Sequence, residues 1–142
     1  MVVLLAIRFL VFLLRTLTFY FSLQINPYFN KSALSFATDS RDPRTLEVLL
    51  QYKGQQLDRK YEQLTPLNSL AKNLNEENAV DVLDCMRLLL RHGASPNIPD
   101  QREMTPLNNV LRNRKIDNNR IKEIVQLFLS ECENKLDLDS YR

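Results

Sequence analysis

The residues that most often carry chemistry in proteins are few and widely spaced in this sequence. His92 is the only histidine, so a site with several histidine ligands is excluded, and no carboxylate stands at a spacing that suggests a catalytic pair with it. Cys85 and Cys132 lie far apart, without the Cys-x-x-Cys spacing of a redox or zinc site. We therefore expect two buried, reduced thiols and a histidine that interacts with the last carbonyls of a helix.

Acidic residues near position 80 form the densest group of potential metal ligands: Glu76, Glu77, Asp81 and Asp84. A calcium loop needs oxygen ligands at ordered alternate positions, in the pattern D-x-[DN]-x-[DN]-G, and this run lacks that order. We therefore expect solvated carboxylates. The sequence also contains no nucleophile elbow, no phosphate-binding loop and no paired carboxylates, so we predict no catalytic residue, no cofactor, no metal and no enzymatic activity.

The composition favours an all-α fold without a nucleic-acid partner. Only two of the 142 residues are glycine, well below the average share of about 7%, so hairpin turns with positive φ have few places to form. The chain has 19 Lys and Arg against 17 Asp and Glu. Removing Arg8 and Arg15, which lie in an acid-free N-terminal segment, leaves 17 charges of each sign in residues 25–142. Such a neutral, mixed surface carries no nucleic-acid footprint.

The first 24 residues differ in character from the rest. Residues 1–24 are apolar nearly throughout and are long enough to span a bilayer as a helix, which takes about 20 residues. A signal peptide is disfavoured, because Arg8 and Arg15 interrupt the apolar run and no small-residue cleavage site follows. Two interpretations stay open: an apolar N-terminal helix that anchors the chain in a membrane, or an artefact of the gene model. Residues 25–31 form a short linker.

A recurring motif in the remaining chain predicts stacked units. The tetrapeptide TPLN begins at Thr65 and again at Thr105, and the segment SALS that begins at Ser32 is a degenerate first copy. The two intervals are 33 and 40 residues, and the seven extra residues of the second interval fit the polar insertion NLNEENAVDV. In this motif threonine can cap a helix, and proline fits the first helical position without losing a hydrogen bond. We expect three units, at residues 32–64, 65–104 and 105–142.

Each unit is expected to contain two helices. In the first helix of the third unit, Leu107, Val110 and Leu111 should face inward. The second helices are predicted in DPRTLEVLLQY, VDVLDCMRLLLRH and RIKEIVQLFLSEC, where aliphatic side chains cluster tightly enough to be buried on most sides. Asp42 should cap the first of these, with Pro43 as its first residue.

The two glycines agree with this arrangement, because Gly54 follows LLQYK and Gly93 follows LLLRH. Both are expected in the left-handed conformation that ends a helix. The residues that define the repeat are thus Gly54, Thr65, Pro66, Leu67, Gly93, Thr105, Pro106 and Leu107.

The run LLLRHGASPNIPD…MTPL resembles an ankyrin repeat, whose period is 33 residues. The resemblance implies a solenoid of about three helix-pair units. Asn68 and Asn108 stand where the family has a histidine that hydrogen-bonds between neighbouring loops, and we expect asparagine to do this less completely. Gln63 and Glu103 stand where a turn glycine is usual, so the loops before each TPL motif should be less regular than in the family.

A narrower resemblance covers roughly residues 31–142, including SALSFATDSRDP, the polar insertion, CMRLLLRHGASPNIPDQ and LDLDSYR. These runs resemble the cytoplasmic ankyrin domain of A-subfamily transient receptor potential cation channels. The resemblance implies a piece of a tetrameric channel that senses noxious heat and mechanical stimuli. That piece would be membrane-associated, would face the cytoplasm, would contain no pore, and would contact other channel subunits or neighbouring ankyrin repeats. The alternative is a free-standing ankyrin adaptor, perhaps anchored by residues 1–24.

The loops that precede the second and third TPL motifs are the predicted partner-binding residues, because the finger loops of ankyrin repeats commonly bind other proteins. The alternative is that these loops are solvated connections between units. The candidate residues are Asp58, Arg59, Lys60 and Tyr61 in the first loop and Asp100, Gln101, Arg102 and Glu103 in the second.

Overall fold

The computed structural model describes residues 2–3, 6–8, 10, 31–132 and 136. The chain divides into two compact parts, Met1–Ala33 and Leu34–Arg142. The helices between residues 31 and 132 are α2 (Ala33–Ser40), α3 (Pro43–Leu50), α4 (Pro66–Lys72), α5 (Ala79–Arg91), α6 (Pro106–Leu111) and α7 (Asn118–Glu131).

Little of the first part, residues 1–33, is described. Residues 2–3, 6–8 and 10 are helical and exposed. Most of the predicted apolar helix over residues 1–24, and nearly all of the linker at 25–31, lie outside the described residues. None of the helices that the described residues form has the length and hydropathy that a membrane span requires.

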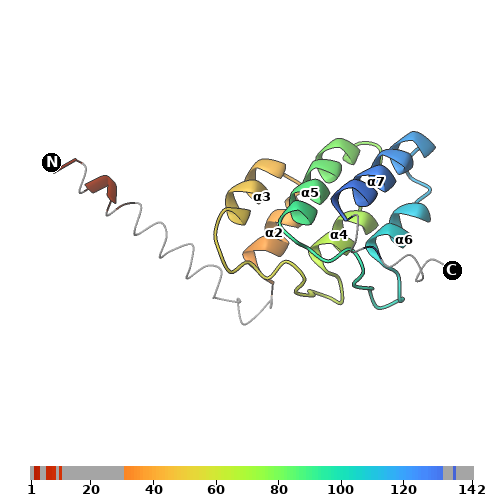
Figure 1. The fold of residues 1–142 in the computed structure, drawn as a ribbon, viewed down its shortest axis with the longest axis horizontal. Helices are drawn as coiled ribbons and strands as arrows, with labels where there is room; N and C mark the ends of the chain where they lie inside the picture. The colour runs from red at the N-terminus through yellow and green to blue at the C-terminus, as the bar shows by residue number, and fades with distance from the viewer. Residues whose placement is uncertain (1, 4–5, 9, 11–30, 133–135, 137–142) are drawn as a thin grey trace. The chain divides into compact units, whose positions relative to one another are not determined.

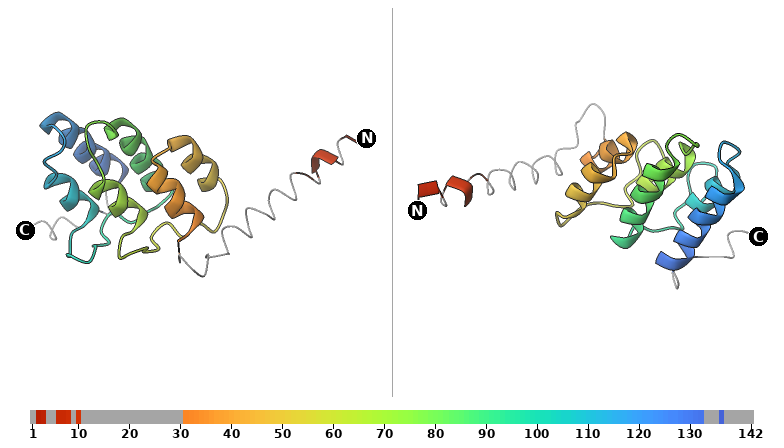
Figure 2. Two further views of the ribbon diagram at one scale, coloured as in Figure 1. Left: turned by 180° about the vertical axis from the view of Figure 1, so that it is seen from behind. Right: turned by 90° about the horizontal axis from the view of Figure 1, so that it is seen from above.

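The second part is a stack of three helix pairs, α2 with α3, α4 with α5, and α6 with α7 (Figures 1 and 2). Each helix pair corresponds to one of the three predicted repeat units. The first helices α2, α4 and α6 form one layer, and the second helices α3, α5 and α7 form the other. Between units α4 packs against α6, and α5 packs against both α3 and α7. The described residues contain no β-strand, apart from an isolated bridge between Tyr61 and Leu64, so the all-α prediction is confirmed.

The two TPLN motifs adopt the same local structure. Thr65 has φ −71° and ψ 160°, and Thr105 has φ −68° and ψ 161°. The Thr65 hydroxyl accepts a hydrogen bond from the Asn68 backbone at 3.2 Å, and that of Thr105 accepts one from the Asn108 backbone at 3.3 Å. A proline follows each threonine and begins the helix, where its missing N–H leaves no hydrogen bond unmade. The predicted caps are therefore confirmed.

Two of the second helices, α3 and α7, are also capped by side chains. Asp42 accepts a hydrogen bond from the Arg44 backbone at 3.1 Å and one from the Thr45 hydroxyl at 2.7 Å, and Pro43 begins α3 as predicted. Asp117, which the sequence did not single out, accepts from the Arg120 backbone at 2.7 Å and caps α7 in the same way. A carboxylate at this position also interacts favourably with the helix dipole.

The two glycines share a conformation but not a position. Gly93 has φ 96° and directly follows the last cap of α5; its backbone donates to the Leu90 carbonyl at 3.0 Å, and Ala94 donates to Leu89 at 3.0 Å. This pair of hydrogen bonds is the Schellman motif. Gly54 has φ 90°, but α3 already ends at Leu50, so the prediction that Gly54 caps this helix was wrong. Residues 51–54 instead form turns between the helix and the following loop.

A single apolar core runs through all three helix pairs. Leu34, Leu67 and Leu107 are buried at matching places of the first helices. Two expectations about the third unit were wrong, because Leu111 is 47% exposed and Leu129 is 49% exposed. Both lie in the last described helix pair, which lacks a following unit within the described residues.

Candidate protein-interaction site

The finger turn before α4 is a tight two-residue hairpin. The Tyr61 backbone donates to the Leu64 carbonyl at 2.9 Å, and Leu64 donates back to Tyr61 at 2.9 Å. Between them Glu62 has φ 50° and Gln63 has φ 66°. Positive φ at both central residues is the type I′ geometry that glycine and asparagine favour. Both side chains are exposed at the tip.

The finger turn before α6 is built differently, around one carboxylate. Asp100 Oδ1 accepts from the backbone of Arg102 at 2.8 Å and from that of Met104 at 3.1 Å. The Asp100 backbone donates to the Met104 carbonyl at 3.0 Å, and Glu103, with φ 60°, donates to the Asp100 carbonyl at 3.1 Å. The two finger turns therefore differ from each other, and both use a non-glycine residue where the family has glycine.

The electrostatics of the second finger turn follow from these hydrogen bonds. Burial of Asp100 raises the pKa of its carboxyl group, but hydrogen bonds from the Arg102 and Met104 backbones and from the Asn109 amide outweigh it and hold the pKa below its usual value. The nearby charge of Lys72 acts in the same direction. Asp100 is therefore ionised at neutral pH and stabilises the shape of the turn.

The structure divides the predicted partner-binding residues into two groups. Asp58 Oδ1 accepts from the Ser95 backbone at 2.8 Å, and Asp100 is buried, so these two carboxylates hold the loops in place. Arg59 and Tyr61 are half-buried, and Arg59 donates to Gln56 at 3.3 Å. The exposed members are Lys60, Gln101, Arg102 and Glu103. Partner binding at these residues stays a prediction.

The asparagines at the family's histidine position behave differently from each other. Asn68 is fully buried; its Nδ2 donates to the Ile98 carbonyl at 2.8 Å, and its Oδ1 accepts from Asn109 Nδ2 at 3.1 Å. Asn109 also donates to Asp100 Oδ2 at 3.3 Å. Asn68 therefore connects α4 to the loop that precedes α6 and to α6 itself. Asn108 is half-buried, and its side chain makes no hydrogen bond with another described residue.

The opposite edge of these units is joined by contacts that the sequence did not predict. Asn113 Nδ2 donates to the Leu74 carbonyl at 2.8 Å, and Glu76 accepts from the Asp117 backbone at the start of α7. The polar insertion that contains Leu74 and Glu76 thus contacts the following unit. A polar run of unusual length between two helices is the signal that could have suggested such a contact.

The residues with potential for chemistry have structural partners. His92 Nδ1 lies 2.8 Å from the Leu88 carbonyl, so the predicted contact with a helix end is confirmed. Cys85 and Cys132 are both buried and do not form a disulfide with each other. Burial, followed by the charges of Asp81 and Asp42, raises the pKa of the Cys85 thiol to about 12, and such a thiol is unreactive. Within the described part of the chain, no group of three potential metal ligands comes together.

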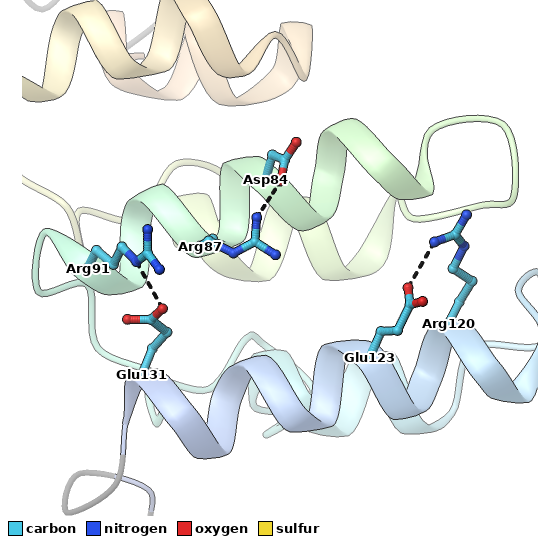
Figure 3. Close-up of polar contacts among 6 residues, drawn as sticks. All are labelled: Asp84, Arg87, Arg91, Arg120, Glu123 and Glu131. Atoms are coloured by element: carbon cyan, nitrogen blue, oxygen red, sulfur yellow. Dashed lines mark hydrogen bonds and ion pairs between the residues drawn. The ribbon is translucent and has the colours of Figure 1, made fainter.

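Three ion pairs lie on the second-helix layer (Figure 3). Arg91 on α5 contacts Glu131 on α7 at 2.9 Å and so joins two units. The other two lie within single helices: Asp84 with Arg87 at 2.6 Å, and Arg120 with Glu123 at 2.8 Å. Because these side chains are partly exposed, each pair contributes at most about 1 kcal/mol.

Comparisons with known proteins agree with this geometry. The family model for the ankyrin repeat matches residues 62–101, which include most of the first finger turn, α4, α5 and most of the next loop. The chain is 59% identical over 121 residues to the transient receptor potential cation channel protein painless of Drosophila melanogaster. The alignment covers 83% of this chain but only 13% of that channel's length. No solved structure matches significantly. The chain therefore contains an ankyrin repeat, and over most of its length it is similar to one part of a transient receptor potential cation channel.

Proposed function

We propose that this chain is a segment of the cytoplasmic ankyrin-repeat region of a painless-like transient receptor potential cation channel, and that it acts by binding rather than by catalysis. The observation that carries the proposal is the 59% identity over 121 residues. This alignment is much longer than the repeat that the family model matches at residues 62–101, so it reflects more than the general ankyrin pattern.

The exposed side of the last helix pair supports a longer stack. In the second unit, whose helices α4 and α5 pack against α6 and α7, Asn68, Ala71 and Leu90 are buried. Their counterparts Asn108, Leu111 and Leu129 are half-buried or exposed. A further helix pair on this face would bury the apolar side chains and give Asn108 an acceptor, as Ile98 does for Asn68. In a channel, such a stack would connect binding events in the cytoplasm to the pore.

Sequencing of transcripts that include codon 142 tests this directly. The channel proposal requires a continuous reading frame that encodes further ankyrin units, six apolar spans and a pore loop. A stop codon after Arg142 in every transcript would contradict it.

A chimera tests whether the segment works in such a channel. The aligned part of painless is replaced by this chain's sequence, and cation currents are recorded from cells that express the chimera. We expect currents close to those of the parent channel, because the fold and the contacts between units are kept. A matched chimera that carries Phe128→Ala should lose current and surface expression, since Phe128 is fully buried in the core. Normal surface expression of the first chimera without current would argue against the proposal.

The second candidate function is a free-standing adaptor that binds other proteins, as ankyrin repeats generally do. The exposed side chains of the finger turns, Lys60, Gln101, Arg102 and Glu103, favour it. The adaptor would be supported over the channel if the full chain captured one defined protein and the stop codon described above were found. Capture should be lost in Lys60→Ala/Arg102→Ala and kept in Lys53→Ala.

A further inference from the structure

Two neighbouring turns with opposite charge lie at the ends of α4 and α6 that are away from the finger turns. The acidic turn contains Glu76, Glu77, Val80 and Asp81, between α4 and the first turn of α5. The basic turn contains Leu111, Arg112, Arg114 and Lys115, between α6 and α7. All eight residues are exposed.

Hydrogen bonds fix the basic turn against the acidic one. Asn113 Nδ2 donates to the Leu74 carbonyl at 2.8 Å, and Asn113 Oδ1 accepts from the Lys115 backbone at 2.7 Å. Ile116 is buried and anchors the end of the turn, while Glu76 accepts from the Asp117 backbone. The two turns are therefore adjacent, and the basic side chains project from a backbone that is already ordered. Binding through these side chains costs little backbone entropy.

The charges of both turns are available for a partner. Within the described residues, the three cations of the basic turn form no ion pair, because the ion pairs present there use Arg87, Arg91 and Arg120. The side chains of Glu77 and Asp81 likewise form no hydrogen bond or ion pair with another described residue.

Each turn also exposes one large apolar side chain next to its charges. Val80 is 56% exposed beside Asp81, and Leu111 is 47% exposed beside Arg112. Apolar contacts surrounded by charged groups are the usual composition of a protein–protein interface.

We propose that this edge binds the same edge of a second copy of the chain, in a two-fold arrangement where each acidic turn faces the basic turn of the other copy. Two adjacent turns of opposite charge are self-complementary under a two-fold axis, because every contact then occurs twice. A purely acidic partner would be attracted to the basic turn and repelled by its acidic neighbour. A purely basic partner would meet the reverse problem.

The pairing is independent of the channel proposal and concerns a different part of the surface. A few exposed ion pairs and two apolar contacts give weak, salt-sensitive association. The association becomes substantial only where copies are held at high local concentration, as in an oligomer.

Charge exchange between the turns tests the pairing. One variant of the full chain carries Glu77→Lys/Asp81→Lys, and a second carries Arg114→Glu/Lys115→Glu. Association is measured by analytical ultracentrifugation of each variant and of their equimolar mixture, at low and high salt. We expect the wild type to associate at low salt, each variant alone to associate at least about tenfold more weakly through like-charge repulsion, and the mixture to recover the wild-type affinity.

The control is Lys53→Glu/Arg102→Glu, which changes the net charge by the same amount as the second variant but alters exposed residues outside both turns. It should associate like the wild type, and circular dichroism of every variant confirms its folding. Association that neither variant weakens, a mixture that fails to recover it, or a wild type that stays monomeric near 1 mM would each overturn the proposal. Transcript sequencing decides the channel proposal separately.

Discussion

The second and third units use the same capping chemistry in different surroundings. Thr65 and Thr105 have nearly identical backbone angles and make the same hydrogen bond. The residues that follow them diverge: Asn68 is fully buried, whereas Asn108 is half-buried without a partner among the described residues. The comparison teaches that local structure in this stack depends on the motif within a unit, whereas burial depends on whether a neighbouring unit is present.

The largest difference in stability between the two units is expected from substitutions in their second helices. Leu90 follows Leu89 as Leu129 follows Phe128, but Leu90 is 5% exposed and Leu129 is 49% exposed. We expect Leu90→Ala to lower the free energy of unfolding by about 2–5 kcal/mol, because it leaves a cavity. Leu129→Ala should stay within about 0.5 kcal/mol of the wild type, as is usual for surface positions. Urea denaturation of both variants measures the difference; equal effects would remove the distinction between the units.

A smaller difference is expected at the two asparagines. Asn68→Ala leaves the half-buried Ile98 carbonyl without its donor and removes one of the two acceptors of the Asn109 amide, so it should cost about 1–3 kcal/mol. Asn108→Ala removes no hydrogen bond to a described residue and should be nearly neutral. Thermal unfolding followed by circular dichroism compares the pair. A large loss for Asn108→Ala would show that its side chain has a partner beyond the described residues.

Substitutions at two residues with positive φ should change the free energy of unfolding in opposite directions. Glu103 has φ 60° and Gly93 has φ 96°. Because side chains strain this conformation, Glu103→Gly should stabilise the chain by about 0.5–1 kcal/mol, whereas Gly93→Val should destabilise it by at least about 1 kcal/mol. Gln63→Gly should resemble Glu103→Gly, since its φ is 66°. Destabilisation by either glycine substitution would mean that the replaced side chain makes contacts that outweigh the strain.

The smallest expected effect is a difference between the two finger turns in how their contribution to stability depends on pH. The Asp100 pKa is lowered in the folded state, so its contribution to stability is present above the unfolded pKa of about 3.9 and is lost as pH falls through the folded pKa. The first finger turn has Lys60 at the corresponding place and lacks this dependence. Asp100→Asn should therefore flatten the decline in melting temperature below about pH 4. A wild-type decline that Asp100→Asn leaves unchanged would assign the acid sensitivity to other carboxylates.

Residues with local roles were the most predictable from sequence. The caps at Thr65, Thr105 and Asp42 and the left-handed Gly93 each depend on groups within a few residues, and propensity rules describe such groups well. Gly54 was misplaced because α3 ends earlier than its apolar pattern suggested. Helix ends are the least certain part of such predictions.

Contacts between units could not be predicted in the same way. The exposure of Leu111 and Leu129 depends on whether another helix pair covers them, and periodicity carries no information about that. The hydrogen bonds that Asp58 and Asp100 accept depend on the exact approach of loop backbones, so their structural role in the loops could not be read from the sequence. The chain also builds a type I′ turn from Glu62 and Gln63, which turn statistics disfavour.

The polar insertion has a mechanical consequence. The second and third units are joined at the finger edge by the hydrogen bond between Asn68 and Asn109, and at the far edge by Asn113 and Glu76, with apolar packing between. Two units that are hydrogen-bonded at both edges of their interface resist rotation relative to each other, whereas units bonded at one edge only can move as a hinge. A torque applied to the third unit should therefore pass to the second with little lost as bending between them.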